Sequence, residues 1–224
     1  DHIRGHLSAA YLEDETLRPP FVTLLASGGH TAVIYTKSAL QFEVLGGTLD
    51  DAAGEAFDKV ARVLGLPYPG GPHIEALARE GSPVVHMPKM LKGEGGYNFS
   101  YSGLKTAVIN YCHTMEQRGE AWSRADVAAS FQSAALDILV QKTVEGALER
   151  NVTTVTAGGG VIANGYLREK LTKACKAHGL RLVLPVKKHC TDNAAMIAAE
   201  GLIQYEAGHF SPMSLNACAS IPLR

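Results

Sequence analysis

Three glycine-rich loops constrain the fold of this 224-residue chain more than any other feature. Each stands at the boundary of a predicted element, and their sequences are Ser27-Gly28-Gly29-His30, Gly70-Gly71 and Gly158-Gly159-Gly160. A strand that ends in glycines and opens into a helix presents backbone N–H groups and the positive end of a helix dipole to a phosphate. One such cluster is more often a structural turn. Three of them at element boundaries favour a nucleotide cleft between two lobes.

The segments between the loops alternate between the periodicities of strands and helices. Short apolar, β-branched runs predict strands over residues 21–25, 31–35, 41–45, 152–156 and 182–185. Helical periodicity is found over residues 2–12, 51–64, 73–79, 103–117, 125–149, 164–178 and 192–204. Residues 81–101 lack periodicity and carry several prolines and glycines, which predicts a surface loop or lid. This alternation predicts an α/β fold.

The third glycine loop also satisfies the form Gly-x-Gly-x-x-Ala of a dinucleotide-binding fingerprint. We reject that interpretation because the loop comes late in the chain and Pro185-Val186-Lys187 stands where a ribose-binding acid belongs. The sequence also lacks the Gly-x-x-x-x-Gly-Lys-Ser/Thr pattern of a P-loop.

Composition describes a globular chain with almost balanced charge. Apolar residues make up 46%, and 21 basic residues stand against 22 acidic ones, so a core is expected and a global positive field for nucleic acid is not. Basic residues cluster locally at Arg168, Lys170, Lys173, Lys187 and Lys188. The four cysteines indicate neither a zinc knuckle nor a disulfide framework, and fit a reducing cytoplasm: Cys112, Cys175, Cys190 and Cys218. No apolar run approaches a membrane span, so we expect a soluble protein without a membrane partner.

Two histidines one helical turn apart open the chain and form a candidate metal site. His2 and His6 share a helix face at this spacing, and Asp192 near the end of the chain can supply a carboxylate. Two histidines and one carboxylate hold a metal ion while leaving coordination positions open for a substrate. The spacing alone is weak evidence, because most pairs of this kind bind nothing.

Acidic residues recur on one face of the predicted helix over residues 51–64. Asp51, Glu55 and Asp58 fall at i, i+4 and i+7. One interpretation is a solvated face in which Glu55 supports Lys59. The other makes Asp58 a bidentate acceptor for ribose hydroxyls beside a phosphate loop. Spacing does not choose between the two.

Longer phrases resemble one enzyme family. They are residues 26–31 (ASGGHT), 47–59 (GTLDDAAGEAFDK), 68–72 (YPGGP), 99–106 (FSYSGLKT) and 190–198 (CTDNAAMIA). Together, in order and through essentially the whole chain, they are similar to the tRNA N6-adenosine threonylcarbamoyltransferases, and His30 resembles the bacterial branch. The resemblance implies an α/β, two-lobed actin/Hsp70/sugar-kinase-like fold. It also implies transfer of a threonylcarbamoyl group from its adenylate to N6 of adenosine 37, 3′ of the anticodon, in tRNAs that read codons beginning with A.

The resemblance also implies roles for individual residues. It makes His2, His6 and Asp192 ligands of one divalent metal ion, Fe²⁺ or Zn²⁺, with no protein nucleophile. Substrate or nucleotide contacts are implied for Leu25, Ala26, Ser27, Gly28, Gly29, Asp58, Gly71 and Asn164, with Gly158, Gly159 and Gly160 beside Asn164. The implied ligands are threonylcarbamoyl-AMP as substrate and an ATP- or ADP-like nucleotide. The implied partners are tRNA, a paralogous subunit of the same fold and a small ATPase.

Two departures from the family accompany the resemblance. Arg4 stands where bacterial relatives often have glutamate, which alters the charge around the metal site without removing a ligand. The resemblance also leads us to expect that these 224 residues do not include the family's N-terminal lobe, which has its own phosphate hairpin. We therefore expect residues 1–224 to form one continuous region, the remainder of the first lobe plus the second, with lobe exchange near residues 100–125 and again near 190.

Other functions compete with the transferase interpretation. An actin-like fold can also act as a nucleotide-binding scaffold without catalysis. A metal-dependent peptidase is remote, because His2-Ile3-Arg4-Gly5-His6 lacks the glutamate that serves as general base in His-Glu-x-x-His enzymes. A serine acyl-hydrolase can point to Ser102 and Lys105, but no Lys-Thr-Gly follows, and Ser102 is expected to cap a helix from Gly103.

Overall fold

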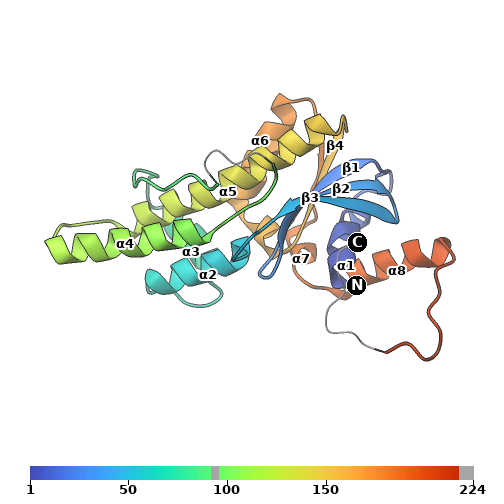
Figure 1. Cartoon of the computed structure of the whole chain (residues 1–224), viewed down its shortest axis with the longest axis horizontal. Helices are drawn as coiled ribbons and strands as arrows, with labels where there is room; N and C mark the ends of the chain where they lie inside the picture. The colour runs from blue at the N-terminus through green and yellow to red at the C-terminus, as the bar shows by residue number, and fades with distance from the viewer. Residues whose placement is uncertain (92–95, 217–224) are drawn as a thin grey trace.

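A mixed five-stranded sheet with helices on both faces forms the centre of the molecule (Figure 1). The computed structural model describes residues 1–91 and 96–216. The strand order is β3-β2-β1-β4-β5, in which β1 to β3 form an antiparallel meander and β4 and β5 run parallel to β1. The strands are β1 (Phe21–Ala26), β2 (Thr31–Ser38), β3 (Gln41–Gly47), β4 (Thr154–Gly158) and β5 (Arg181–Val183).

The central strand β1 is buried on both faces, which explains its unbroken apolar sequence. All six of its residues are buried. Val22 and Leu24 belong to the core on the side of helix α5 (Arg124–Glu149), while Leu25 packs with Ile3 of helix α1 (His2–Ser8). Alternate side chains of a strand point to opposite faces, so β1 joins the two helical layers into one structure.

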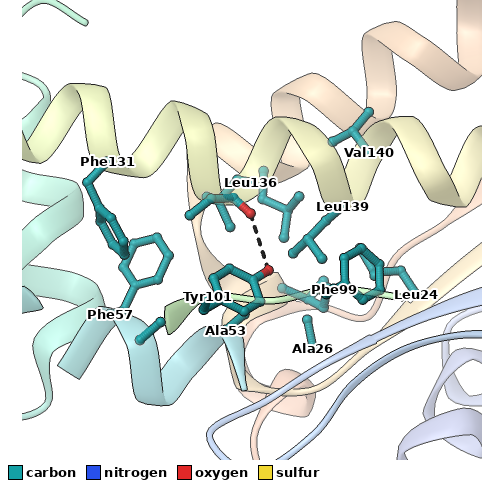
Figure 2. Close-up of a cluster of buried hydrophobic side chains, with 14 of the residues drawn as sticks. Leu24, Ala26, Ala53, Phe57, Phe99, Tyr101, Phe131, Leu136, Leu139 and Val140 are labelled. Carbon is teal, nitrogen blue, oxygen red and sulfur yellow. Dashed lines mark hydrogen bonds between the residues drawn. The ribbon is translucent and has the colours of Figure 1, made fainter. Parts of the chain in front are cut away.

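The larger core lies between the sheet and the helices on the α5 side. These helices are α2 (Ala53–Val63), α3 (Gly70–Ala78), α4 (Ser102–Arg118), α5 and α6 (Gly165–Ala177). Figure 2 shows Phe57 of α2 against Phe131 of α5, with ring centroids 5.0 Å apart and ring planes at 63°. The hydroxyl of the fully buried Tyr101 donates to the carbonyl of Ala135 at 3.3 Å. That bond satisfies the only polar atom this side chain brings into the core.

The opposite face is covered by the two ends of the described chain. Helix α1 continues into a 3₁₀ turn, η1 (Ala9–Leu12), and α8 (Ala194–Glu206) packs on both, after the short helix α7 (Lys187–Cys190). The helices approach closely at Gly5, where a Cβ would lie 2.9 Å from Cδ1 of Ile197. None of the described helices has the length and apolar character that a bilayer crossing needs.

The observed elements confirm the predicted α/β fold, with several differences. Strand β4 lies two residues later than expected, and the predicted helix over 192–204 begins after Asn193, whose side chain accepts from the Met196 N–H at 2.9 Å as its cap. The segment 81–101 is not purely a surface loop, because Phe99 and Tyr101 are fully buried. Its residues 92–95 lie outside the described part of the chain, as does Cys218; the other cysteines are buried free thiols.

The expectation that Ser102 caps α4 is wrong. Its hydroxyl donates to the Asp50 carboxylate at 2.7 Å instead of accepting from the helix, and the same carboxylate accepts from the Tyr101 N–H at 2.7 Å. These hydrogen bonds hold the pKa of Asp50 below its usual value although burial opposes that shift. The carboxylate of Asp50, 52 positions before Ser102, is therefore the group that caps the start of α4.

Candidate functional site

The two histidines and the distant aspartate meet at one end of the sheet. His2 and His6 lie one turn apart on α1, and Asp192 lies in the segment between α7 and α8. Their potential ligand atoms are all within 4.8 Å of one another, and Nε2 of His6 is 3.0 Å from a carboxylate oxygen of Asp192. The His6 side chain is 2% exposed and that of Asp192 is 79% exposed. The cluster therefore has a buried base and a side open to solvent.

Capping residues flank the cluster on both helices. The Asp1 carboxylate accepts from the N–H groups of Ile3 and Arg4, at 2.8 and 3.1 Å, and so begins α1 at His2. Asn193 begins α8 directly after Asp192 in the same way. Each candidate ligand therefore lies within the first turns of a capped helix or beside its cap, where the backbone direction is well defined.

The electrostatics of the cluster suit a metal ion. Burial lowers the pKa of His6, and the neighbouring Asp192 carboxylate opposes that shift without overcoming it. The neutral imidazole, which is the ligating form, is thereby favoured. Nδ1 of His6 is buried and has no hydrogen-bond partner among the described residues. Two imidazoles and a carboxylate, with potential ligand atoms within 4.8 Å of one another, thus fit Fe²⁺ or Zn²⁺ chemically.

Two of the glycine loops adjoin this cluster. β1 and β4 are parallel neighbours, with Leu25 opposite Gly158, so the loops that follow them lie at the same edge of the sheet. A Cβ at Gly159, whose φ is +101°, would lie 2.3 Å from the carbonyl oxygen of Ala26. A Cβ at Gly158 would lie 2.4 Å from the carbonyl oxygen of His6. These glycines allow three backbone segments to pack together beside the histidines.

The β1–β2 loop presents its backbone to solvent. The Ser27 N–H donates to the His30 carbonyl at 2.8 Å and the His30 N–H donates to Ser27 Oγ at 3.0 Å, which closes the loop. Gly28 and Gly29 are exposed, and a Cβ at either would meet nothing within 4 Å, whereas Leu25 and Ala26 are fully buried in β1. Of the five residues implied as substrate-binding backbone, the two glycines are thus the most accessible.

Sequence reasoning missed His30 as a neighbour of the cluster. Its ring centroid is 5.6 Å from that of His2, in an edge-to-face arrangement. The pKa of His30 is lowered mainly by burial and to a smaller extent by the nearby His2. The only signal was a histidine directly after Gly28-Gly29, in a loop whose position relative to α1 the sequence does not specify.

The acidic residues at and before α2 have two kinds of surroundings. Asp51 and Glu55 fit the interpretation as a solvated face, whereas Asp58 does not. Lys59 contacts Glu55 at 2.8 Å and Asp51 at 2.6 Å, which is the solvated ion-pair arrangement. Asp58 instead accepts from the Gly70 N–H at 2.6 Å and so holds the N-terminus of α3. Gly71, the next residue, has open space where a Cβ would stand. Binding of ribose by Asp58 stays a prediction.

Asn164 is buried beside the third glycine loop and forms hydrogen bonds through both ends of its side-chain amide. Its side-chain carbonyl accepts from the Leu167 N–H at 3.0 Å as the cap of α6, and its side-chain nitrogen donates to Oε1 of Gln132 at 2.9 Å. Glu75 of α3 accepts from the adjacent Gly165 N–H at 3.1 Å, a contact that sequence reasoning did not anticipate. This contact brings α3, which begins with Gly70 and Gly71, next to the start of α6.

Three members of the basic cluster that the sequence indicates have partners within the chain, which leaves a smaller set directed to solvent. The Arg168 guanidinium donates to the carbonyl of Pro185 at 2.9 Å, while Lys170 lies 3.5 Å from Asp137 and Lys173 lies 2.5 Å from Glu169. Lys187 and Lys188 are both exposed and lie on α7, a few residues before Asp192. These two lysines are therefore the basic side chains of the cluster best placed to meet an anionic partner near the site.

Comparisons with known proteins agree with the resemblance of the sequence. A family model described as tRNA N6-adenosine threonylcarbamoyltransferase matches residues 1–199. Proteins of that name are 45% identical in Clostridium botulinum (strain 657) over 100% of this chain and 66% of the relative, and 49% identical in Caldicellulosiruptor saccharolyticus with the same coverage. The relative in Geobacillus thermodenitrificans is 51% identical over 99% of this chain and 65% of its own length. The chain thus spans about two thirds of the length of these curated relatives.

Solved structures support the fold assignment. Full-length HypF in a phosphate- and nucleotide-bound form superposes with a TM-score of 0.72 at 13% identity, over 94% of this chain and 43% of that one. HypF of T. kodakarensis gives a TM-score of 0.64 at 17% identity, over 93% and 37%. At these identities the likeness concerns the fold alone. Together with the family match, it identifies the α/β architecture as part of an actin/Hsp70/sugar-kinase-like fold.

Removal of one ligand tests the metal site. Asp192→Ala should abolish stoichiometric Zn²⁺ or Fe²⁺ binding, a larger loss than the roughly 10- to 100-fold that changes around a ligand produce. The fold should persist, because the Asp192 side chain is 79% exposed. His6→Ala should lose metal likewise, and His178→Ala, an exposed histidine at the end of α6, is the matched control. Elemental analysis and far-UV circular dichroism measure both properties; full occupancy in Asp192→Ala would show that the site is misassigned.

Proposed function

We propose that this chain, which belongs to the tRNA N6-adenosine threonylcarbamoyltransferase family, provides the metal-binding and nucleotide-binding part of an enzyme that forms N6-threonylcarbamoyladenosine in tRNA. The observation that carries the proposal is the meeting of His2, His6 and Asp192 beside two phosphate-type glycine loops. The substrates are threonylcarbamoyl-AMP and adenosine 37 of tRNAs that read codons beginning with A. Because the chain spans about two thirds of its relatives, we assign the complete activity to the full-length protein.

The metal site would hold one divalent ion, Fe²⁺ or Zn²⁺. Such an ion supplies Lewis-acid chemistry, which neutralises phosphate charge and polarises a carbonyl. His6 suits the role of a metal ligand. Burial lowers its pKa, so protons compete poorly with a metal ion for its imidazole. The exposure of Asp192 keeps the opposite side of the site accessible to a substrate as large as an acyl adenylate.

The backbone and acidic residues would orient the adenylate. Gly28 and Gly29 have no side chains to screen their amides, so a phosphate can approach the β1–β2 loop closely. Asp58 and Gly71 lie at the junction of α2 and α3, and one oxygen of Asp58 already accepts from Gly70. Its second oxygen suits a ribose hydroxyl. Nucleotide binding is further supported by the HypF structure of similar fold, which is itself nucleotide-bound.

The proposed reaction requires no protein nucleophile. The N6 nitrogen of adenosine attacks the carbamoyl carbon, the bond from that carbon to the phosphate oxygen breaks, and AMP leaves with the electron pair while the nitrogen loses a proton. Positioning the amine and the acyl adenylate next to each other supplies most of the advantage in such a transfer. A peptidase would need a general base between the two histidines, and this chain has Arg4 among those residues.

The partners follow from the same proposal. With a formal net charge of −1, the chain lacks a long-range field that would hold tRNA tightly, so we assign part of that task to a paralogous subunit and a small ATPase. Lys187 and Lys188 are the residues of this chain that we propose to contact tRNA phosphates. A cytoplasmic location suits a reaction on tRNA and the free buried thiols Cys112, Cys175 and Cys190.

A transfer assay tests the proposed activity. A chimera that joins this chain to the remaining third of the Geobacillus thermodenitrificans relative should modify a matching tRNA when threonylcarbamoyl-AMP, the paralogous subunit and the small ATPase are supplied. Mass spectrometry of tRNA nucleosides measures the product. Asp192→Ala in the chimera should reduce the rate to background, and His178→Ala should leave it unchanged. A chimera that binds metal and nucleotide but transfers nothing would favour the scaffold alternative.

Nucleotide affinity tests the role of Asp58. Loss of a charged hydrogen-bond acceptor should cost about 1.5–3 kcal/mol, or roughly ten- to a hundredfold in affinity for ADP. Calorimetry should find this loss in Asp58→Ala, while Glu55→Ala, an exposed residue on the same helix, should bind as the wild type does. Asp58→Asn keeps an oxygen for the Gly70 N–H and separates charge from helix capping. Unchanged affinity in Asp58→Ala would leave Asp58 with a structural role only.

A further inference from the structure

A buried carboxylate joins the two helices that carry the candidate ligands. Glu200 lies on the face of α8 that packs against α1 and is 7% exposed. Ser8 Oγ donates to one carboxylate oxygen at 2.7 Å, and the Gln204 side-chain amide donates to the other at 2.7 Å. The Arg4 guanidinium is 3.8 Å from the same carboxylate. These partners offset the free-energy cost of removing the Glu200 carboxylate from water, and they fix its position between the two helices.

Arg4 extends the contact to the sheet. Its guanidinium lies over the ring of Phe42 in β3, 4.8 Å from the ring centroid, and its side chain is 29% exposed. Arg4 and Glu200 thus form a complementary pair of charges between α1 and α8.

The geometry links this contact to the metal site. Arg4 and Ser8 lie one turn apart on α1, alternating with His2 and His6 along the same short helix. Glu200 lies eight residues beyond Asp192, along the helix that Asp192 precedes. Between the two contacts, α1 and α8 approach closely at Gly5, where a Cβ would lie 2.9 Å from Cδ1 of Ile197. The distance of Asp192 from the histidines therefore depends on how α8 is fixed along α1.

A small cavity with both polar and apolar side chains in its lining adjoins the contact. It has a volume of about 20 Å³ and is lined by residues that include Ser8, Tyr11, Thr36 and Glu200. The hydroxyls of Tyr11 and Thr36 are buried and have no hydrogen-bond partner among the described residues. A polar space of this size accommodates one water molecule. Truncating Glu200 would enlarge it and admit further water between the helices.

We propose that Glu200 is a positioning residue that fixes α8 on α1 through Ser8 and Arg4 and thereby sets the spacing of Asp192 from His2 and His6. This inference rests on the metal site proposed above. Glu200 touches neither the metal ligands nor the substrate in this role; it acts through the placement of a helix. Its effect is accordingly expected on metal affinity as well as on the stability of α8.

Zinc affinity of the full 224-residue chain, measured by calorimetry in competition with a chelator, tests this role. Glu200→Ala should weaken Zn²⁺ binding severalfold, less than the roughly 10- to 100-fold found when a group bonded directly to a metal ligand is removed. Glu200→Gln keeps an oxygen for Ser8 and should recover part of the loss. Ser8→Ala, a smaller change, should weaken binding in the same direction. Glu206→Ala, exposed at the end of α8, is the matched control and should bind as the wild type does.

Hydrogen exchange in the metal-free chain gives an independent readout. The amides of α8 should exchange faster in Glu200→Ala than in Glu206→Ala, because the first variant loses a contact to α1. Faster exchange with unchanged zinc affinity would reduce Glu200 to a purely structural role and overturn the inference alone. Unchanged exchange and unchanged affinity would overturn it too. Failure of the wild-type chain to bind Zn²⁺ would contradict the metal site itself, and the inference with it.

Discussion

The close approach of backbone segments at Gly158 and Gly159 is the constraint on which the candidate site depends. A Cβ at Gly158 would overlap the carbonyl of His6, and a Cβ at Gly159 would overlap that of Ala26. Without those side chains, α1 and the β1–β2 loop settle against the end of β4. The parallel pairing of β1 and β4 then holds both loops at one edge of the sheet, where helix starts and loop amides can face a ligand.

The remaining ligand comes from the far end of the described chain. Asp192 reaches His6 because α8 returns to pack on α1, and the caps Asp1 and Asn193 define where both helices begin. Burial favours the neutral form of His6, whereas Asp192 stays exposed. The result is a site with a fixed, dehydrated side and an accessible side, which suits a metal ion that must also meet a substrate.

Periodic and local features were predictable from the sequence, and long-range contacts were not. The apolar runs and helical periods indicated the strands and helices, and the spacing of His2 and His6 indicated a shared helix face. The capping of α4 by Asp50, the contact of His30 with His2 and the engagement of Asn164 by Gln132 depend on residues that only the folded chain brings together. The residue types made Asp192 a candidate partner of the histidines, and the resemblance to the transferase family implied that all three are ligands of one metal ion.

The central claim is that His2, His6 and Asp192 together bind one metal ion. Anomalous diffraction at the zinc absorption edge, from crystals of this chain grown with one equivalent of Zn²⁺, tests it most directly. The account predicts a single peak among these three side chains, with ligand distances of about 2.0–2.2 Å. A map without a peak there, or with zinc held by other residues while these three remain unligated, would contradict it.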